Sequence, residues 1–242
     1  MTGRRRSSVA TAARPSAQAP DLLVEAGALR AGARRVAGMD EVGRGALAGP
    51  VSVGLVVVDI ETGPAPHGVA DSKLLSAGAR TALLPALSTW GVARAVGHAS
   101  AAEVDRWGVV GALRLAGWRA LDAVSTDHPV DVVILDGSHD WLSRAPLDDL
   151  LEDAAPRPGD PPEVRMLVKA DRRCASVAAA SVLAKCERDA LMVELSAAHP
   201  AYGWAANKGY GSAEHLAALT ALGPSPLHRR TWRLPGTSPA VG

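Results

Sequence analysis

The chain has 242 residues, of which 48% are hydrophobic and 21% are charged, and its formal net charge is +1. This length is sufficient for one large globular domain with an appendage. The apolar runs are interrupted well short of the roughly 20 residues that a membrane-spanning helix needs. The only two cysteines form no CxxC pair, which indicates structural thiols in a reducing compartment. The composition thus excludes a membrane protein and a disulfide-rich secreted domain, and it predicts a soluble, cytoplasmic protein.

The small net charge hides an uneven distribution along the chain. Residues 1–35 carry seven Lys/Arg and two Asp/Glu, residues 36–164 carry nine and eighteen, and residues 165–242 carry ten and five. An acidic middle is therefore flanked by two basic ends. Two interpretations stay open at this point: a solvated surface, or an acidic metal centre whose basic flanks hold a nucleic-acid backbone.

The order of the predicted elements indicates an α/β core followed by a helical carboxyl-terminal region. Residues 1–20 contain three consecutive arginines and no apolar stretch, which predicts a disordered basic tail. Helices are expected at Asp21–Arg30, Ser76–Thr89, Ala101–Val124, Ala175–Ala198 and from the capping Ser212 to Leu222. Strands are expected at Arg35–Asp40, Val51–Val58, Val92–His98, Val130–Leu135 and Glu163–Val168. Two irregular segments are also expected, a surface excursion and a Gly/aromatic loop, at Ser143–Pro162 and Tyr202–Gly211.

Carboxylates follow three of the expected strands. Asp40 and Glu41 end the first strand, Asp136 follows Val130–Leu135, and Asp171 follows the last strand. Neighbouring strand residues point to opposite faces, so the first two acids can serve one centre only if their strand ends or bends there. Oxygen ligands without a Cys/His cluster favour Mg²⁺ or Mn²⁺ over Zn²⁺. Such ions can promote phosphodiester hydrolysis. For Asp136, an aspartate that only stabilises a turn is the alternative interpretation.

The turn Gly43-Arg44-Gly45 directly follows the first acid pair. Its glycines let backbone amides approach a phosphate closely, so a metal ion and a polyanion can meet at this point. A dinucleotide-binding enzyme is an alternative, because Gly49 extends the glycine pattern. However, that fingerprint requires a helix after the glycines, and Val51–Val58 is strand-like.

Seven motifs between Val36 and Trp232 occur in the order seen in ribonuclease HII, and the chain resembles this family. They are Asp40-Glu41-Val42-Gly43-Arg44-Gly45, Asp71-Ser72-Lys73, Leu135-Asp136-Gly137, Lys169-Ala170-Asp171, Ala179-Ala180-Ser181-Val182-Leu183-Ala184-Lys185, Lys208-Gly209-Tyr210 and His228-Arg229-Arg230. The resemblance implies a ribonuclease H-like fold, with a mixed five-stranded sheet flanked by helices and a helical carboxyl-terminal region. It also implies an endoribonuclease that cuts the RNA strand of RNA–DNA hybrids. Such enzymes nick DNA on the 5′ side of embedded ribonucleotides by two-metal-ion hydrolysis, leaving 5′-phosphate and 3′-hydroxyl ends.

The resemblance also implies a role for each matching residue. The catalytic metal ligands for Mn²⁺ or Mg²⁺ would be Asp40, Glu41, Asp136 and, as the fourth acid, Asp171. The backbone of Gly43, Arg44 and Gly45 would contact the 2′-hydroxyl and nearby phosphates, and Tyr210 would pack on the ribonucleotide sugar. The remaining expected substrate contacts are Ser72, Lys73, Ser181, Lys185, Arg229 and Arg230. A non-catalytic nucleic-acid-binding module with the same fold is the alternative, although four carboxylates facing phosphates would weaken a pure binder.

The expected domain organisation follows from these motifs. Residues 21–200 would form the catalytic core and residues 201–242 a helical substrate-binding region and tail. The partners would be RNA–DNA hybrids and ribonucleotide-containing duplex DNA, bound by a monomer with no membrane attachment. His139, His215 and His228 are expected at the surface, because chemistry based on metal-bound water needs no histidine base.

Overall fold

The computed structural model describes residues 19–125, 127–143 and 162–235. Five strands form one mixed sheet in the order β3-β2-β1-β4-β5. Their bounds are Val36–Val42 for β1, Val51–Val58 for β2, Ala93–Ala99 for β3, Val132–Asp136 for β4 and Glu163–Leu167 for β5. The first three pair antiparallel, whereas β4 runs parallel to both β1 and β5. The mixed five-stranded sheet is therefore confirmed, with the strand positions expected from the alternation of hydrophobic and polar segments.

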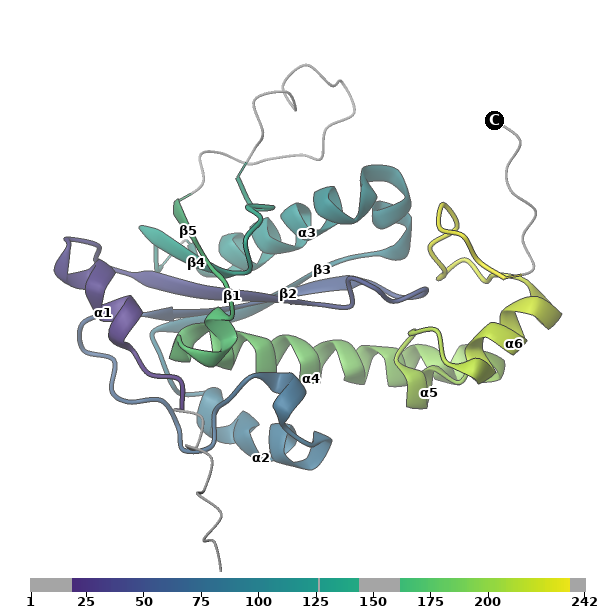
Figure 1. Ribbon diagram of the computed structural model, residues 1–242, viewed down its shortest axis with the longest axis horizontal. Helices are drawn as coiled ribbons and strands as arrows, with labels where there is room; N and C mark the ends of the chain where they lie inside the picture. Colours follow the sequence, from purple (N-terminus) through teal and green to yellow (C-terminus); the bar gives the residue numbers. More distant parts are fainter. Residues whose placement is uncertain (1–18, 126, 144–161, 236–242) are drawn as a thin grey trace, which may run out of the picture.

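Helices cover both faces of this sheet (Figure 1). The helix α3, Ala101–Ser125, packs on one face, and the helix α4, Ala175–Ala198, packs on the other. The shorter helices α1, Leu23–Arg30, and α2, Ala77–Leu87, lie on the α4 side. Two apolar cores result, one between the sheet and α3 and one between the sheet and α4. None of the helices that the structure describes is long and apolar enough to cross a bilayer.

Small residues let α4 lie unusually close to the sheet. A Cβ atom added at Gly54 in β2 would lie 2.2 Å from the carbonyl oxygen of Ala180 in α4, a distance that real Cβ atoms do not adopt. The alanines of this helix are buried against the same strands. Because the alanine-rich face needs no space for long side chains, α4 brings its polar residues directly beneath the edge of β1.

The carboxyl-terminal region packs against the second half of α4. It contains two short helical turns, η4 (Pro200–Tyr202) and α5 (Trp204–Asn207), before helix α6, Ala213–Leu222. The segment expected as a plain loop thus contains helical turns. A third apolar cluster joins Ala48 of the turn after β1 to Met192 of α4 and Leu219 of α6.

Two further expectations concern segments that the structure leaves undescribed. The predicted disordered tail falls mostly on residues 1–18, and the predicted surface excursion falls on residues 144–161. Both lie outside the described residues. The proposed boundary at residue 200 stays a prediction.

Candidate active site

The parallel pairing of β1 and β4 brings two predicted acids to one edge of the sheet. Met39 lies opposite Leu135 in this register, so the next residues, Asp40 and Asp136, stand side by side at the carboxyl ends of adjacent strands. Asp171 lies in the 3₁₀ turn η3, Ala170–Arg172, which follows β5. The backbone N–H of Ala170 donates to Asp136 Oδ1 at 2.7 Å and so ties this turn to β4.

The structure differs from the sequence prediction at the end of β1. The strand does not stop at Asp40 but stays paired with β2 through Val42, with Glu41 opposite Val53. Asp40 therefore points to the α4 face, towards Ser181, and Glu41 points to the opposite face of the sheet. The structure thus shows no bend at the two acids, because regular pairing with β2 continues past both of them.

Burial and mutual repulsion disfavour the charged forms of these acids. Asp40 is 4% exposed, and its burial, together with the charge of Glu41, raises its pKa to about 7. Burial, with Asp136 next in importance, raises the pKa of Asp171 to about 6. Burial also raises the pKa of Glu41, although the Arg44 guanidinium opposes this rise. The acids thus form an electrostatically unfavourable group that a cation would stabilise.

Lys73 places a positive charge near these acids from the 3₁₀ turn η1, Ser72–Leu74. Partial burial lowers the pKa of this lysine, but nearby carboxylates outweigh that effect and raise it; they are Asp40, Asp71, Asp171 and Asp136. Because one ammonium group faces several carboxylates, it cannot neutralise them all. The excess negative charge remains available for a metal ion.

The residues fit a hard divalent cation by their chemistry. All candidate ligands are carboxylate oxygens, the donors that Mg²⁺ and Mn²⁺ prefer. Asp171 Oδ1 is buried without a hydrogen-bond partner, which leaves one acceptor unsatisfied. Within the described ranges, no three acids, histidines or cysteines are grouped closely enough to hold a metal ion as they stand. The acids thus share one edge of the sheet without forming a finished ligand cage.

The raised pKa values make the stability of the metal-free protein depend on pH. Asp40 has its pKa at about 7 when folded, against 3.8 for the ordinary side chain, so the folded state holds this proton more tightly. Its contribution is fully present below the unfolded pKa and is lost as pH rises through the folded one. We expect urea denaturation in EDTA to show a loss of roughly 2–4 kcal/mol from this group between about pH 5 and pH 8. Asp40→Asn should flatten that difference, and an identical pH profile in both proteins would contradict the burial argument.

The turn Gly43-Arg44-Gly45 leads directly away from these acids. Gly43 adopts a φ of +83°, and a Cβ atom there would lie 2.1 Å from Arg188 Nε, so the position admits only glycine. Its backbone N–H donates to the hydroxyl oxygen of Tyr210 at 3.2 Å. The structure therefore brings two predicted substrate-binding elements together, although they are 167 residues apart in the sequence.

The burial of Arg229 contradicts one prediction from the sequence. Arg229 was expected to contact a phosphate, but its side chain is fully buried. Its guanidinium donates to the carbonyl oxygens of Arg44 at 2.8 Å, Gly43 at 2.6 Å and Gly49 at 3.2 Å. Arg229 thus holds the backbone of the turn from inside. Its neighbour Arg230 is exposed, as a phosphate contact must be.

A second buried arginine, which the sequence did not single out as functional, supports the same turn. Arg188 of α4 is fully buried and donates to the carbonyl oxygens of Pro50 at 2.8 Å, Lys208 at 2.9 Å and Ala48 at 3.2 Å. These contacts connect the turn after β1 to the segment that carries Tyr210. The sequence offered one signal of this role, which is the position of Arg188 in an alanine-rich helix. An arginine buried on such a face needs several hydrogen-bond acceptors from other parts of the chain.

The remaining predicted substrate contacts fall into two groups. Ser72 and Ser181 are buried and hydrogen-bonded to each other at 2.7 Å, so they lie behind Asp40 rather than on an open surface. Lys73 is exposed, and Lys185 is partly exposed. Lys185 Nζ lies 2.6 Å from Asp189 Oδ1 and 5.9 Å from the centre of the Tyr210 ring. The two lysines therefore reach the surface and the serines do not, and the phosphate contacts of the lysines stay a prediction.

The histidine prediction is correct for one residue and wrong for two. His139 is exposed, as expected. His215 is completely buried and His228 is 1% exposed, and both lie in the carboxyl-terminal region near Tyr210. Sequence alone gave no periodic signal for this burial, because α6 is short and its apolar residues do not form one clear stripe.

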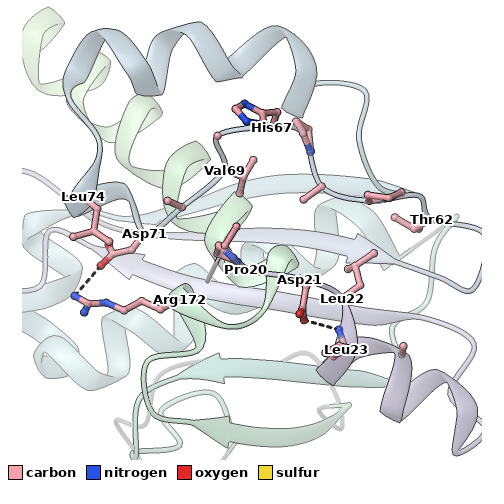
Figure 2. Close-up of a pocket in the computed structure, with 17 residues that line it drawn as sticks. Pro20, Asp21, Leu22, Leu23, Thr62, His67, Val69, Asp71, Leu74 and Arg172 are labelled. Carbon is pink, nitrogen blue, oxygen red and sulfur yellow. Dashed lines mark hydrogen bonds and ion pairs between the residues drawn. The ribbon is translucent and has the colours of Figure 1, made fainter. Parts of the chain in front are cut away.

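A separate apolar pocket lies beside this site (Figure 2). Its volume is about 970 Å³, and it is formed by the start of α1, the loop around Pro64–Ala70 and the turn η1. Asp71 and Arg172, which form an ion pair at 3.5 Å, lie at one end of the pocket, and Arg172 directly follows Asp171 in the chain. None of the predicted catalytic or substrate-binding residues lines this pocket, so the site is identified by its chemistry and not by cavity size.

A sequence model of ribonuclease HII matches residues 37–234, which contain all of the acids and the turn described above. The chain belongs to the ribonuclease HII family. A ribonuclease HII of Streptomyces avermitilis is 46% identical over 203 residues, covering 83% of this chain and 78% of the relative. As a member of the ribonuclease HII family, the chain is a metal-dependent endoribonuclease that acts on RNA–DNA hybrids.

Solved structures confirm that this chain has a ribonuclease H-like fold. The ribonuclease H2 of Pyrococcus horikoshii OT3 superimposes with a TM-score of 0.58 at 25% identity, covering 82% of this chain and 94% of that one. Bst-RNase HIII in complex with Mn²⁺ gives a TM-score of 0.55 at 29% identity, covering 78% of this chain and 63% of that one. The alternative of a dinucleotide-binding enzyme is therefore wrong.

Proposed function

We propose that this protein also nicks duplex DNA on the 5′ side of a single embedded ribonucleotide, leaving 5′-phosphate and 3′-hydroxyl ends. The observation that carries the proposal is the hydrogen bond between the Gly43 N–H and the Tyr210 hydroxyl. It joins the turn that follows the acids to an aromatic ring suited to packing on a sugar. Cutting chemistry and sugar recognition therefore lie on adjoining elements.

The metal ions in this proposal are Mg²⁺ or Mn²⁺, held by Asp40, Glu41, Asp136 and Asp171. Two ions would activate the attacking water and stabilise the leaving oxygen. Support comes from the all-oxygen donor set, from the raised pKa values of Asp40 and Asp171, and from the Mn²⁺ bound in the Bst-RNase HIII structure. The protein's contribution is to hold four carboxylates at one edge, where the cation offsets their repulsion.

The turn and Tyr210 would distinguish RNA from DNA at the cleavage point. The 2′-hydroxyl is the one group that separates the two sugars, and a backbone amide can read it without reading the base. Arg229 turns the carbonyl groups of Gly43 and Arg44 inward, and the exposed Gly45 leaves the outer side of the turn open to substrate. Lys73, Lys185 and Arg230 would contact phosphates and make binding depend on salt.

All residues assigned here come from one chain, so in this proposal the enzyme acts as a monomer. Its substrates are the RNA–DNA hybrids and ribonucleotide-containing duplexes of the cytoplasm. Residues 201–242 form the substrate-binding part, which contributes Tyr210 and Arg230, and residues 21–200 contribute the acids.

The proposal is tested with an end-labelled DNA duplex that contains one ribonucleotide. We expect the purified protein to produce a single nick on the 5′ side of that ribonucleotide with Mg²⁺ or Mn²⁺, and no product with EDTA or with an all-DNA duplex. A 5′-phosphate on the downstream fragment would support the proposed chemistry, whereas a 5′-hydroxyl would contradict it. Tight binding of this duplex without any nick would contradict the proposal.

A further inference from the structure

A buried hydrogen-bond network connects Tyr210 to the carboxyl-terminal segment. His215 Nδ1 lies 2.8 Å from the carbonyl oxygen of Tyr210, and His215 Nε2 lies 3.0 Å from His228 Nε2. Trp204 Nε1 donates to His215 Nε2 at 3.2 Å. At the far end, the Ser225 backbone N–H donates to His228 Nδ1 at 3.0 Å. None of these side chains takes part in the chemistry described above.

These contacts determine the proton positions without ambiguity. A carbonyl oxygen only accepts, so His215 must carry its proton on Nδ1, which leaves Nε2 as the acceptor for Trp204 and His228. His228 must then carry its proton on Nε2, which leaves Nδ1 to accept from the Ser225 backbone. Burial lowers the pKa of both imidazoles, that of His228 to about 4, in keeping with two neutral rings. Every member of the network is satisfied in one arrangement only.

The segment that carries Tyr210 is held from both sides. Before it, the carbonyl oxygen of Gly209 accepts from the backbone N–H of Leu47 at 2.8 Å, which attaches the segment to the turn after β1. After it, the Tyr210 carbonyl oxygen accepts from His215 Nδ1 and from the Ser212 backbone N–H, both at 2.8 Å. Among the described residues, this histidine is the only side chain that hydrogen-bonds this carbonyl. Losing its hydrogen bond would leave this carbonyl held by the Ser212 backbone N–H and would loosen the Tyr210 backbone on this side.

We propose that His215 is a positioning residue that holds the Tyr210 backbone through its Nδ1 hydrogen bond and thereby sets the preference for a single embedded ribonucleotide. This inference rests on the proposed role of Tyr210 in sensing the sugar. A lone ribonucleotide offers its 2′-hydroxyl at only one position along the strand. If the Tyr210 ring is displaced, no other position of the substrate can restore the contact. An all-RNA strand offers a 2′-hydroxyl in every register and tolerates the displacement better.

The test compares His215→Asn with His215→Gln. The asparagine amide lies close to the position of Nδ1 and can still donate to the Tyr210 carbonyl, whereas the glutamine amide lies closer to Nε2. Initial rates are measured on the single-ribonucleotide duplex and on an all-RNA hybrid, and their ratio is the preference. We expect His215→Gln and His215→Ala to lower this ratio roughly 3- to 10-fold, as one lost hydrogen bond would, and His215→Asn to keep it near the parent value.

Leu219→Ala is the control for a general loss of stability, because Leu219 is buried one helical turn further along α6 but lies outside the network. It should lower the melting temperature and leave the ratio unchanged. A ratio that falls in Leu219→Ala too, or that is the same in His215→Asn and His215→Gln, would overturn the positioning role. Tyr210→Ala separates the two proposals: if it lowers the ratio and His215→Gln does not, only the present inference fails. If Tyr210→Ala leaves the ratio unchanged, both fail.

Discussion

Asp40→Asn is expected to lower the rate of hybrid cleavage by at least about a thousandfold at saturating metal. The substitution keeps the shape of the side chain but removes its negative charge from the edge where β1 and β4 meet. Asp40 stands beside Asp136 there and is 4% exposed, so no other carboxylate can take its position. Initial rates on a labelled RNA–DNA hybrid over a range of Mg²⁺ and Mn²⁺ concentrations measure the effect.

Measuring the stability of the Asp40→Asn variant distinguishes a loss of activity caused by unfolding from one caused by the missing metal ligand. Burial and the charge of Glu41 raise the pKa of Asp40 to about 7, so the neutral amide should make the metal-free protein more stable at about pH 8. An inactive variant with a higher denaturation midpoint cannot owe its inactivity to unfolding. Adding Mn²⁺ should raise the midpoint of the parent protein more than that of Asp40→Asn.

Asp131 offers the matched control, because it lies next to the opposite end of the same strand β4 and accepts from the backbone N–H groups of Arg34 and Arg35. Asp131→Asn should leave the cleavage rate within about twofold of the parent. A fully active Asp40→Asn protein would refute the metal assignment. Equal losses in Asp40→Asn and Asp131→Asn would point to a general effect of charge instead.

The second large effect is expected from Arg229→Ala. Its guanidinium donates to the carbonyl groups of Gly43, Arg44 and Gly49, which lie in the turn that follows the acids. Removing it leaves these acceptors without a donor and creates a cavity, at a cost of about 3–5 kcal/mol in the free energy of unfolding. The turn loses its orientation at the same time, so cleavage should fall by roughly a hundredfold at temperatures where the variant stays folded.

The adjacent Arg230 provides the contrast. Its side chain is exposed, and only its backbone N–H is held, by Asp105 at 2.8 Å. Arg230→Ala should change stability by less than about 0.5 kcal/mol and should reduce the slope of log affinity against log salt by about one. Urea denaturation and binding titrations at several salt concentrations measure both quantities. If Arg229→Ala changed the salt slope and left stability intact, Arg229 would be a phosphate contact after all.

Arg229→Lys tests the geometry of the contact rather than its charge. Lysine keeps the positive charge but presents one ammonium group instead of a planar fork, and it cannot reach three carbonyl groups in the same way. It should recover little of the activity lost in Arg229→Ala. A fully restored enzyme would show that the turn needs only a nearby cation.

The motifs and hydrophobic patterns of the chain were sufficient to predict its strands and the acids at their ends. β2 lies at Val51–Val58 and α4 at Ala175–Ala198, as expected, because a continuous β-branched run and a long alanine-rich segment each favour a single structure. The sequence did not predict that β1 continues through Val42, because the glycines that permit a bend do not determine where it comes.

Roles that depend on burial were harder to predict. Arg229 and Arg230 are adjacent in sequence and identical in type, yet one is fully buried and the other is exposed. No local pattern separates them, because the difference comes from the carbonyl groups of a turn about 185 residues away. The same holds for His215 and His228, whose burial depends on how α6 packs against α5 and the turn after β1.

The sequence by itself thus determined the chemical groups of this protein: its carboxylates, its glycine turn, its tyrosine and the order in which they occur. The tertiary structure decided which of its polar residues are exposed and which hold the turn from within. The reason is physical, because a charged or polar side chain can be buried only where distant backbone groups satisfy its hydrogen bonds. Those partners come together only when the strands, α4 and the carboxyl-terminal segment have packed.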